Sequence, residues 1–436
     1  MKKKDTDNLP EVKSENRMGR RDFFKAGTVG AAGTALGFAA ILSKRNELAA
    51  KVVKNKSIKL HEDFPVKISD DLKRFRQKNT VFSRGMWDNA IKGDLGKLIA
   101  FETHDKNGWS PLDRAISLAG WSMEDQFAFL SKLGNPMTPA YAWEGRVRED
   151  KYKFKSAADA TKKVKKASRF LGADLVGISK YNPLWGYDPL YVLTKNKEVP
   201  AKFPFQPKSV IVMAIEMDYR TIATSPSYIS DSTVGLCYSR MAELANSVTT
   251  FLRELGYKSF GSGNDIAMSI PYAIEAGLGE LGRNGLLVTY EYGPRVRLCK
   301  VFTELELIPD KPISFGVQEF CKMCGLCAEA CPSKAIPFDR DPTWKGKTIS
   351  NNNGAYKWYI DPEKCMKMWG ENDCACINCV ASCPYNKPDM WHHRLITGIT
   401  KLPGNPLHYS MVKMDRAFGF GNTYDQKAID RWWDED

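Results

Sequence analysis

The stretch that decides the fold is "CKMCGLCAEACP", residues 321–332, in which the last of four cysteines is followed by a proline. Its spacing, C-x2-C-x2-C-x3-C-P, is that of bacterial ferredoxins, where three close thiolates bind one iron–sulfur cluster and the fourth reaches a second cluster. The two-residue gaps direct three sulfurs to one side of a coiled loop, and the three-residue gap turns the fourth away. The stretch therefore predicts a domain that binds two clusters.

A second set of cysteines follows in "CINCVASCP", residues 376–384, with Cys365 standing apart before it. Crosswise pairing of the two sets gives two four-thiolate sites. The expected ligands of the first 4Fe-4S cluster are Cys321, Cys324, Cys327 and Cys383. Those of the second are Cys331, Cys365, Cys376 and Cys379, with Cys374 as an alternative to Cys365. Structural zinc is the competing interpretation, although zinc ribbons favour two separated C-x2-C pairs without the C-P ending.

The first 50 residues are predicted to be an export leader. "RRDFFK", residues 20–25, is followed by 17 uncharged residues, 26–42. This order is typical of a twin-arginine leader, and the apolar run is short for a bilayer span of about 20 residues. Ala40 and Ala50 are alternative cleavage points. Twin-arginine export carries folded proteins, so a cofactor inserted before export explains the cysteine pattern better than disulfides do.

Length and charge limit the remaining classes of function. The chain has 436 residues, of which 43% are hydrophobic, so it is long enough to bury a large core and to carry a smaller domain. Its formal charge of +13 comes from scattered basic residues rather than from a basic run interleaved with aromatic ones. Nucleic-acid binding is therefore not expected; attraction to anionic lipid head groups or to an acidic partner remains open.

Hydrophobic periodicity predicts a mixed α/β (α+β) core ahead of the cysteines. Apolar residues at helical spacing indicate helices over residues 157–171 and 233–255, and Gly256 ends the second. Buried strands are expected at residues 175–178 and 209–217. The predicted organisation is a leader at 1–50, a helical and loop region at 51–155, an α/β core at 156–315, a two-cluster ferredoxin-like domain at 316–390, and a C-terminal extension packing on the core at 391–436.

No nucleotide or single-metal motif accompanies these elements. "GLGELGRNG", residues 277–285, has the letters of a dinucleotide-binding loop, but it lies between a helical run and a strand-like run, which is the wrong context. The five histidines include no H-E-x-x-H pair. Long loops on a rigid scaffold often shape a site, and residues 181–207 form such an excursion. Its aromatic residues Trp185, Tyr187 and Phe203 are candidate pocket walls or core residues.

Taken together, these motifs resemble a known family. They are the leader, the stretch "EAGLGELGRNGLLVTYEYGPRVRLCKVF" at residues 275–302, the first cysteine run after it, and "KCMKMWGENDCACINCVASCPYNK" at residues 364–387. The chain resembles the reductive dehalogenases of anaerobic organohalide-respiring bacteria over about residues 10–390. Within that family it is most similar to enzymes that act on chlorinated alkanes such as chloroform and chloroethanes.

The resemblance implies a corrinoid in a nitroreductase-like core, with two 4Fe-4S clusters that pass electrons to its cobalt. No histidine stands in a D-x-H-x-x-G motif, so a cobalt ligand from that motif is not expected. The family's proton-donating tyrosine falls on Tyr238, its helper asparagine on Asn264 and its pocket arginine on Arg297. A free tyrosine, with a pKa of about 10, is a weak acid, and a neighbouring guanidinium eases release of its proton. Arg295 is the alternative arginine, because residues two apart face the same side of a regular strand.

For each of these residues a plainer role is open, since Tyr238 in a helix can simply pack and Asn264 can be a turn residue. The implied reaction replaces halogen by hydrogen on a small organohalide. The implied partners are a small multi-span membrane anchor and an upstream respiratory donor, with a possible homodimer, and the implied location is peripheral, at the outer face of the cytoplasmic membrane. Two rivals remain: an exported two-cluster electron carrier without corrinoid, and an enzyme similar to epoxyqueuosine reductase.

Overall fold

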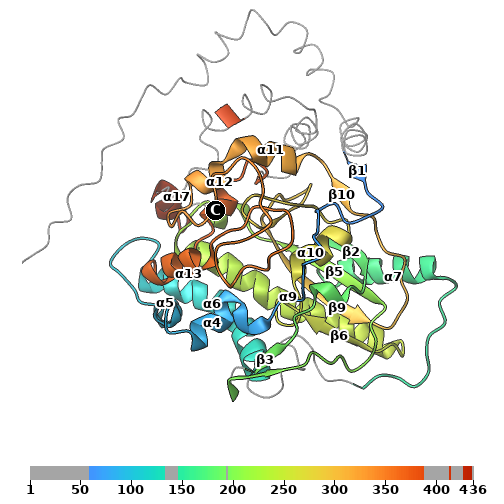
Figure 1. Ribbon diagram of the computed structural model, residues 1–436. Helices are drawn as coiled ribbons and strands as arrows, with labels where there is room; N and C mark the ends of the chain where they lie inside the picture. The colour runs from blue at the N-terminus through green and yellow to red at the C-terminus, as the bar shows by residue number, and fades with distance from the viewer. Residues whose placement is uncertain (1–57, 133–145, 193–194, 387–411, 414–425, 435–436) are drawn as a thin grey trace, which may run out of the picture. The chain divides into compact units, whose positions relative to one another are not determined.

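A four-stranded antiparallel sheet organises the core of this computed structural model, which describes residues 58–132, 146–192, 195–386, 412–413 and 426–434 (Figure 1). The strand order is β2 (Leu175–Lys180), β5 (Ser209–Glu216), β9 (Val296–Thr303) and β6 (Ser259–Ser262). All described residues belong to one compact unit. The mixed α+β class expected from the sequence is confirmed.

Both faces of the sheet are covered by helices, which explains why β5 reads as a continuous apolar run. Met213 on β5 lies opposite Cys299 on β9, and both pack in the core cluster formed with α7 (Ala157–Phe170) and α9 (Tyr228–Glu254). The alternate residue Val212 packs on the other face, with Ile274 of α10 (Ser269–Glu275). Successive side chains of a strand point to opposite faces, so β9 can present residues to α9 on one side only.

The predicted strands at 175–178 and 209–217 and the helix at 157–171 are confirmed with small shifts at their ends. The predicted start of the second helix, at residue 233, is wrong, because α9 begins five residues earlier. Ser227 caps the helix by accepting a hydrogen bond from Ser230 N, while Ser230 Oγ accepts one from Ser227 N. Residues 230–233 are polar in sequence but buried, so hydrophobic periodicity does not reveal this part of the helix. Gly256 follows the helix with φ of 79°, as its role as a stop requires.

Helices from the first part of the chain lie beside the cysteine region, which comprises residues 317–386. Figure 1 shows α4 (Val81–Trp87), α5 (Lys92–Ala100) and α6 (Pro111–Lys132) in blue next to the orange α13 (Pro362–Glu371). Helix α6 packs along α9, and α13 packs on α5 and α4. Residues far apart in the sequence therefore support the helix that carries Cys365.

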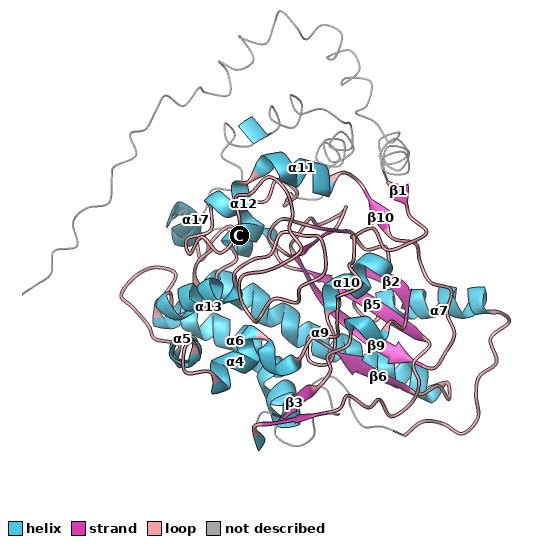
Figure 2. Cartoon of the chain, in the orientation of Figure 1, coloured by secondary structure: helices cyan, strands magenta, loops and turns pink. Residues whose placement is uncertain are grey.

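Short helices joined by loops make up the cysteine region (Figure 2). They are α11 (Val317–Cys324), α12 (Leu326–Glu329), α13 and α14 (Asn378–Ala381). The remaining short elements are β1 (Lys59–Leu60), η1 (Gln77–Asn79), η2 (Pro183–Trp185), β3 (Leu190–Val192), β4 (Lys197–Val199), α8 (Tyr219–Ile222), β7 (Glu280–Leu281), β8 (Leu287–Val288), β10 (Ile313–Ser314) and α17 (Gln426–Arg431). Strands β1 and β10 pair, which ties the start of the described chain to the entrance of the cysteine region.

Two predicted segments lie mainly or wholly beyond this description. The predicted leader, residues 1–50, is outside the described residues. Of the expected C-terminal extension, 391–436, only 412–413 and 426–434 are described, and Ile429 of α17 packs with Trp109 and Tyr228. The boundaries of the five predicted domains stay predictions.

Candidate active site and cysteine pockets

Four cysteines from both cysteine runs line one pocket of about 340 Å³. They are Cys321, Cys324, Cys327 and Cys383. Helix α11 ends at Cys324, and Gly325, with φ of 69°, turns the chain so that α12 presents Cys327. Arg283 Nη2 donates a hydrogen bond of 2.7 Å to Cys321 O, which fixes the backbone at the first cysteine. Burial raises the pKa of the Cys321 thiol to about 11.

The other four predicted ligands line a second pocket, of about 430 Å³. They are Cys331, Cys365, Cys376 and Cys379. Burial raises the pKa of Cys376 to about 11 and that of Cys379 to about 12. Cys374 lies elsewhere: it is fully buried in a cluster with Trp109 and Tyr228. The geometry therefore groups Cys365, rather than Cys374, with the other three thiols.

The two pockets adjoin, and Asn284 lines both of them. Its Nδ2 donates a hydrogen bond of 3.4 Å to Cys379 O. Within the described ranges, no group of three or more His, Cys, Asp or Glu side chains is arranged to hold a single metal ion. A zinc ion with Zn–S bonds of about 2.3 Å would need such an arrangement, so the described thiols do not form a site for a single zinc ion.

Tyr238, Asn264 and Arg297 are brought together from three different elements. Tyr238 lies on α9, half buried, and accepts a hydrogen bond of 2.9 Å from Asn264 Nδ2 at its hydroxyl oxygen. The guanidinium carbon of Arg297, on β9, lies 5.4 Å from the centre of the Tyr238 ring. Trp121 of α6 stacks on the same ring, with ring centroids 5.2 Å apart and planes at 24°. The phenol thus contacts a cation and an indole, with an amide at its oxygen.

The Trp121 ring is itself held by a buried carboxylate. Asp231 of α9 accepts hydrogen bonds from Trp121 Nε1 at 2.9 Å and from Ser117 Oγ at 2.5 Å. Burial raises the pKa of Asp231, and these two hydrogen bonds oppose that rise. Sequence analysis did not single out Trp121 or Asp231, because neither belongs to a recognisable motif.

Arg295 and Arg297 have different environments, although the sequence left them as alternatives. Arg295 is buried, and its Nε and Nη2 donate to Glu216 Oε1 at 3.0 and 2.6 Å. It precedes β9, so the strand alternation that made the two equivalent does not extend to it. Arg297 faces α9, and its Nε is buried without a hydrogen-bond partner among the described residues. Arg297 therefore has a donor free for a bound group.

An apolar cavity of about 910 Å³ opens beside Asn264. Its walls include Trp185 and Tyr187, two of the aromatic residues that the sequence offered as walls. The third, Phe203, instead stacks on Phe260 and Phe302 in the core, with ring centroids 5.4 and 5.7 Å away. The polar lining residues are Asn264, Ser269, Asn352 and Lys357.

Comparisons with known proteins add the family. Residues 320–387 match the family model described as a 4Fe-4S dicluster domain. The tetrachloroethene reductive dehalogenase of Desulfitobacterium hafniense is 37% identical over 75% of this chain and 71% of its own length. That of Sulfurospirillum multivorans is 32% identical over 97% of this chain and 94% of its own length. The chain belongs to the reductive dehalogenase family.

A solved reductive dehalogenase shares the fold. That structure, described as suggesting a mechanism for B12-dependent dehalogenation, aligns with a TM-score of 0.68 at 23% identity. The alignment covers 89% of this chain, which spans 53% of the solved chain. The reductive dehalogenase is thus an oxidoreductase with a 4Fe-4S domain, and its family supports iron–sulfur and corrinoid cofactors. The sequence left two rival functions, an electron carrier and an epoxyqueuosine-type enzyme. Membership of the reductive dehalogenase family favours neither of them.

The cavity beside Asn264 fits a corrinoid in its chemistry. A corrinoid is a flat macrocycle rimmed with amide groups, and the cavity combines apolar walls with amide and ammonium donors from Asn264, Asn352 and Lys357. Burial lowers the pKa of Lys357 to about 8. The unpartnered Nε of Arg297 lies on the same side of the sheet as Tyr238. These residues would hold the ring and face the substrate.

Proposed function

We propose that this reductive dehalogenase replaces halogen by hydrogen on a small organohalide, using two electrons that pass through two 4Fe-4S clusters to a corrinoid and a proton from Tyr238. The balanced reaction is R–X plus two electrons and one proton giving R–H and X⁻. The observation that carries the proposal is the contact of Tyr238 with Asn264 and Arg297 beside the apolar cavity. A bound corrinoid supplies the reduced cobalt that carries out cleavage of the carbon–halogen bond.

The electron path is supported by the adjoining thiol pockets. Cys321, Cys324, Cys327 and Cys383 are the proposed ligands of one cluster, and Cys331, Cys365, Cys376 and Cys379 those of the other. Asn284 lies against both pockets, so two clusters bound there are neighbours. Arg283 fixes the backbone at Cys321 by its hydrogen bonds to Cys321 O, which favours retention of a cluster in the first pocket.

Proton delivery is supported by the partners of the Tyr238 hydroxyl. Asn264 donates to the phenol oxygen, and this bond leaves the phenol's own proton available to the substrate. As the proton departs, the Asn264 amide and the Arg297 guanidinium stabilise the negative charge on the oxygen. The free Nε of Arg297 is also a donor for the leaving halide.

The substrate is proposed as a chlorinated alkane such as chloroform or a chloroethane, on the strength of the resemblance. Tetrachloroethene is a second candidate, because the relatives from D. hafniense and S. multivorans carry its name. An apolar cavity with aromatic walls suits either, since neither substrate offers strong hydrogen-bonding groups. Rates of halide release from chlorinated alkanes and from tetrachloroethene, measured side by side, distinguish the two candidate substrates.

Export and attachment also belong to the proposal. The predicted twin-arginine leader puts the mature enzyme at the outer face of the cytoplasmic membrane, with a small multi-span anchor protein and an upstream respiratory donor as partners. None of the helices within the described ranges is both long and apolar enough to cross a bilayer. Fractionation of producing cells, with and without an Arg20→Lys and Arg21→Lys double substitution in the leader, tests the route.

The function is tested first by metal content and halide release from protein purified without oxygen and matured with corrinoid. We expect about eight irons and one cobalt per chain, with chloride released from chloroform or chloroethanes at the expense of a low-potential donor. About eight irons without cobalt, in protein that releases no halide, would contradict the proposal and favour a two-cluster electron carrier.

A further inference from the structure

We propose that Lys300 and Ser269 are positioning residues that hold the Asn264 amide in the orientation that serves Tyr238. The inference rests on the proposed function, because it concerns the residue proposed as the proton donor. Neither side chain belongs to a motif, and neither contacts Tyr238. What they do instead is fix the orientation of the amide group that does contact it.

Lys300 is a buried cation in the middle of an apolar strand. It lies on β9, is fully buried, and donates from Nζ to Ser269 Oγ at 2.9 Å and also to Gly263 O. A buried ammonium is costly unless hydrogen bonds compensate for lost water, so a lysine at this position requires a specific reason. Burial lowers the pKa of Lys300 to about 8, with the Asp265 carboxylate opposing the shift.

Ser269 links Lys300 to Asn264, because its hydroxyl accepts from one and donates to the other. An ammonium has only donors, so Ser269 Oγ must accept from Lys300. The single hydroxyl proton of Ser269 is then donated to Asn264 Oδ1 at 2.7 Å, a shorter contact than the 3.4 Å from Ser269 Oγ to Gly263 O. With its oxygen bound to Ser269, the amide must turn its NH₂ group toward the Tyr238 hydroxyl, 2.9 Å away.

The opposite amide orientation would present an oxygen to the phenol oxygen. Such an oxygen cannot stabilise the charge that develops when Tyr238 gives up its proton, and it would compete for that proton by accepting it. Asn264 is exposed toward the cavity, Ser269 is buried in the cavity wall, and Lys300 is fully buried. The amide is therefore held in one orientation from the core side, and Lys300 supplies the donor that decides which one.

A purely structural role for Ser269 and Lys300 is the alternative, since Lys300 also binds the Gly263 carbonyl and so supports the turn. The Ser269→Ala variant distinguishes the positioning role from the purely structural one. It removes the hydroxyl between Lys300 and Asn264 but leaves the Lys300 bond to Gly263 O in place. Ser269→Thr restores the hydroxyl. Ser168→Ala is the control, because Ser168 is also buried and its hydroxyl donates to Val164 O within α7, away from Asn264.

The experiment combines crystal structures with kinetics of the complete, cofactor-loaded enzyme. In Ser269→Ala we expect Asn264 to leave the Tyr238 hydroxyl, and kcat for halide release to fall about tenfold, with unchanged KM and metal content. The solvent deuterium isotope effect on kcat should rise, because proton transfer becomes slower. Ser269→Thr should recover both values, and Ser168→Ala should match the wild type.

Each result bears on the inference separately from the function. Asn264 still within hydrogen-bond distance of Tyr238 in Ser269→Ala, or wild-type kcat and isotope effect in that variant, overturns the positioning role. A kcat loss that Ser269→Thr does not recover, or that Ser168→Ala reproduces, assigns Ser269 to general stability and overturns it as well. If the wild type releases no halide while Asn264 moves in Ser269→Ala, the positioning role stands and the proposed function fails.

Discussion

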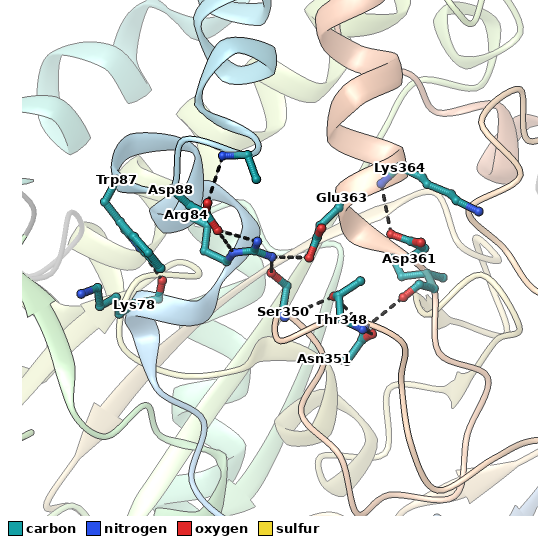
Figure 3. Close-up of polar contacts among 12 residues, drawn as sticks. Lys78, Arg84, Trp87, Asp88, Thr348, Ser350, Asn351, Asp361, Glu363 and Lys364 are labelled. Carbon is teal, nitrogen blue, oxygen red and sulfur yellow. Dashed lines mark hydrogen bonds and ion pairs between the residues drawn. The ribbon is translucent and has the colours of Figure 1, made fainter.

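Arg84 of α4 donates a hydrogen bond to Glu363 of α13, two residues before Cys365 (Figure 3). The guanidinium is buried, with its side chain 6% exposed, and it also donates to Ser350 Oγ at 3.0 Å and to Asp88 Oδ2 at 2.9 Å. Because α13 carries one thiol of the second pocket, a residue far away in the sequence supports the position of that thiol. Three groups converge on one cation, which makes this link far more specific than a surface ion pair.

Replacing Arg84 by Met is expected to weaken the second thiol pocket. The loss leaves the Glu363 and Asp88 carboxylates without their shared cation, so the free energy of unfolding should fall by about 3 kcal/mol. With α13 loosened, iron should fall from about eight toward about four atoms per chain. Iron analysis and denaturant unfolding of the purified variant measure both effects.

Arg76→Met is the control for that change. Arg76 also pairs with a glutamate, Glu198, but its side chain is 56% exposed and far less of its interaction is sheltered from water. Iron content should therefore remain at the wild-type value. Equal iron loss in both variants would argue against a special role for the Arg84 link.

Tyr238→Phe should abolish most dehalogenation while leaving the cofactors bound. The ring and its stack on Trp121 are kept, and only the hydroxyl that meets Asn264 is lost. A positioned acid contributes about 10² to 10⁴ in rate, so kcat should fall by at least about 100-fold. Tyr257→Phe, which removes a hydroxyl bonded to Tyr152 O on the surface, should keep wild-type kcat. Near-normal halide release by Tyr238→Phe would require another proton donor.

Gln substitutions of Arg295 and Arg297 are expected to have opposite effects. Arg297→Gln removes the cation near Tyr238 and should lower kcat by about 10- to 100-fold with little change in stability. Arg295→Gln breaks the pair with Glu216 and should lower the free energy of unfolding by about 3 kcal/mol, with kcat nearly retained in the folded fraction. The reverse pattern would reassign the functional arginine to Arg295.

The sequence was enough to predict two of the four strands of the sheet, β2 and β5, and the grouping of the thiols. Strands such as β5 are short apolar runs, and the ferredoxin spacing limits which sulfurs can meet, so local pattern determines the result. It could not choose between Cys365 and Cys374, because the choice depends on where α13 packs. Nor could it choose between Arg295 and Arg297, because the start of β9 had to be known to the residue.

Residues that act through long-range contacts could not be predicted. Ser269 and Trp121 are ordinary in sequence and gain a role only through Asn264 and Tyr238. Lys300 did leave a signal, since a lysine interrupts the apolar run of β9. A charged residue in a buried strand is worth examining, because burial requires it to have a specific partner.

Cys365→Ser and Cys374→Ser form a matched pair for the second cluster. Cys365→Ser removes a thiol from the pocket, and iron should fall toward about four atoms per chain. Cys374→Ser changes a buried thiol outside the pocket, so iron should stay at about eight while stability drops slightly. Iron analysis and electron paramagnetic resonance of the reduced proteins measure the outcome. Iron loss in Cys374→Ser alone would return the ligand role to Cys374.

The buried amine of Lys300 predicts a pH dependence of stability. Its pKa is lowered by burial from 10.5 to about 8, so between these values the unfolded chain binds a proton that the folded chain has lost. The contribution of Lys300 to the free energy of unfolding therefore rises as the pH increases between these two pKa values. Relative to Lys300→Met, in which the titration is absent, the wild type should gain about 1 kcal/mol between about pH 7 and pH 9. Paired unfolding curves at both pH values test this, and a difference that stays constant or shrinks with pH would show that Lys300 keeps its proton when folded.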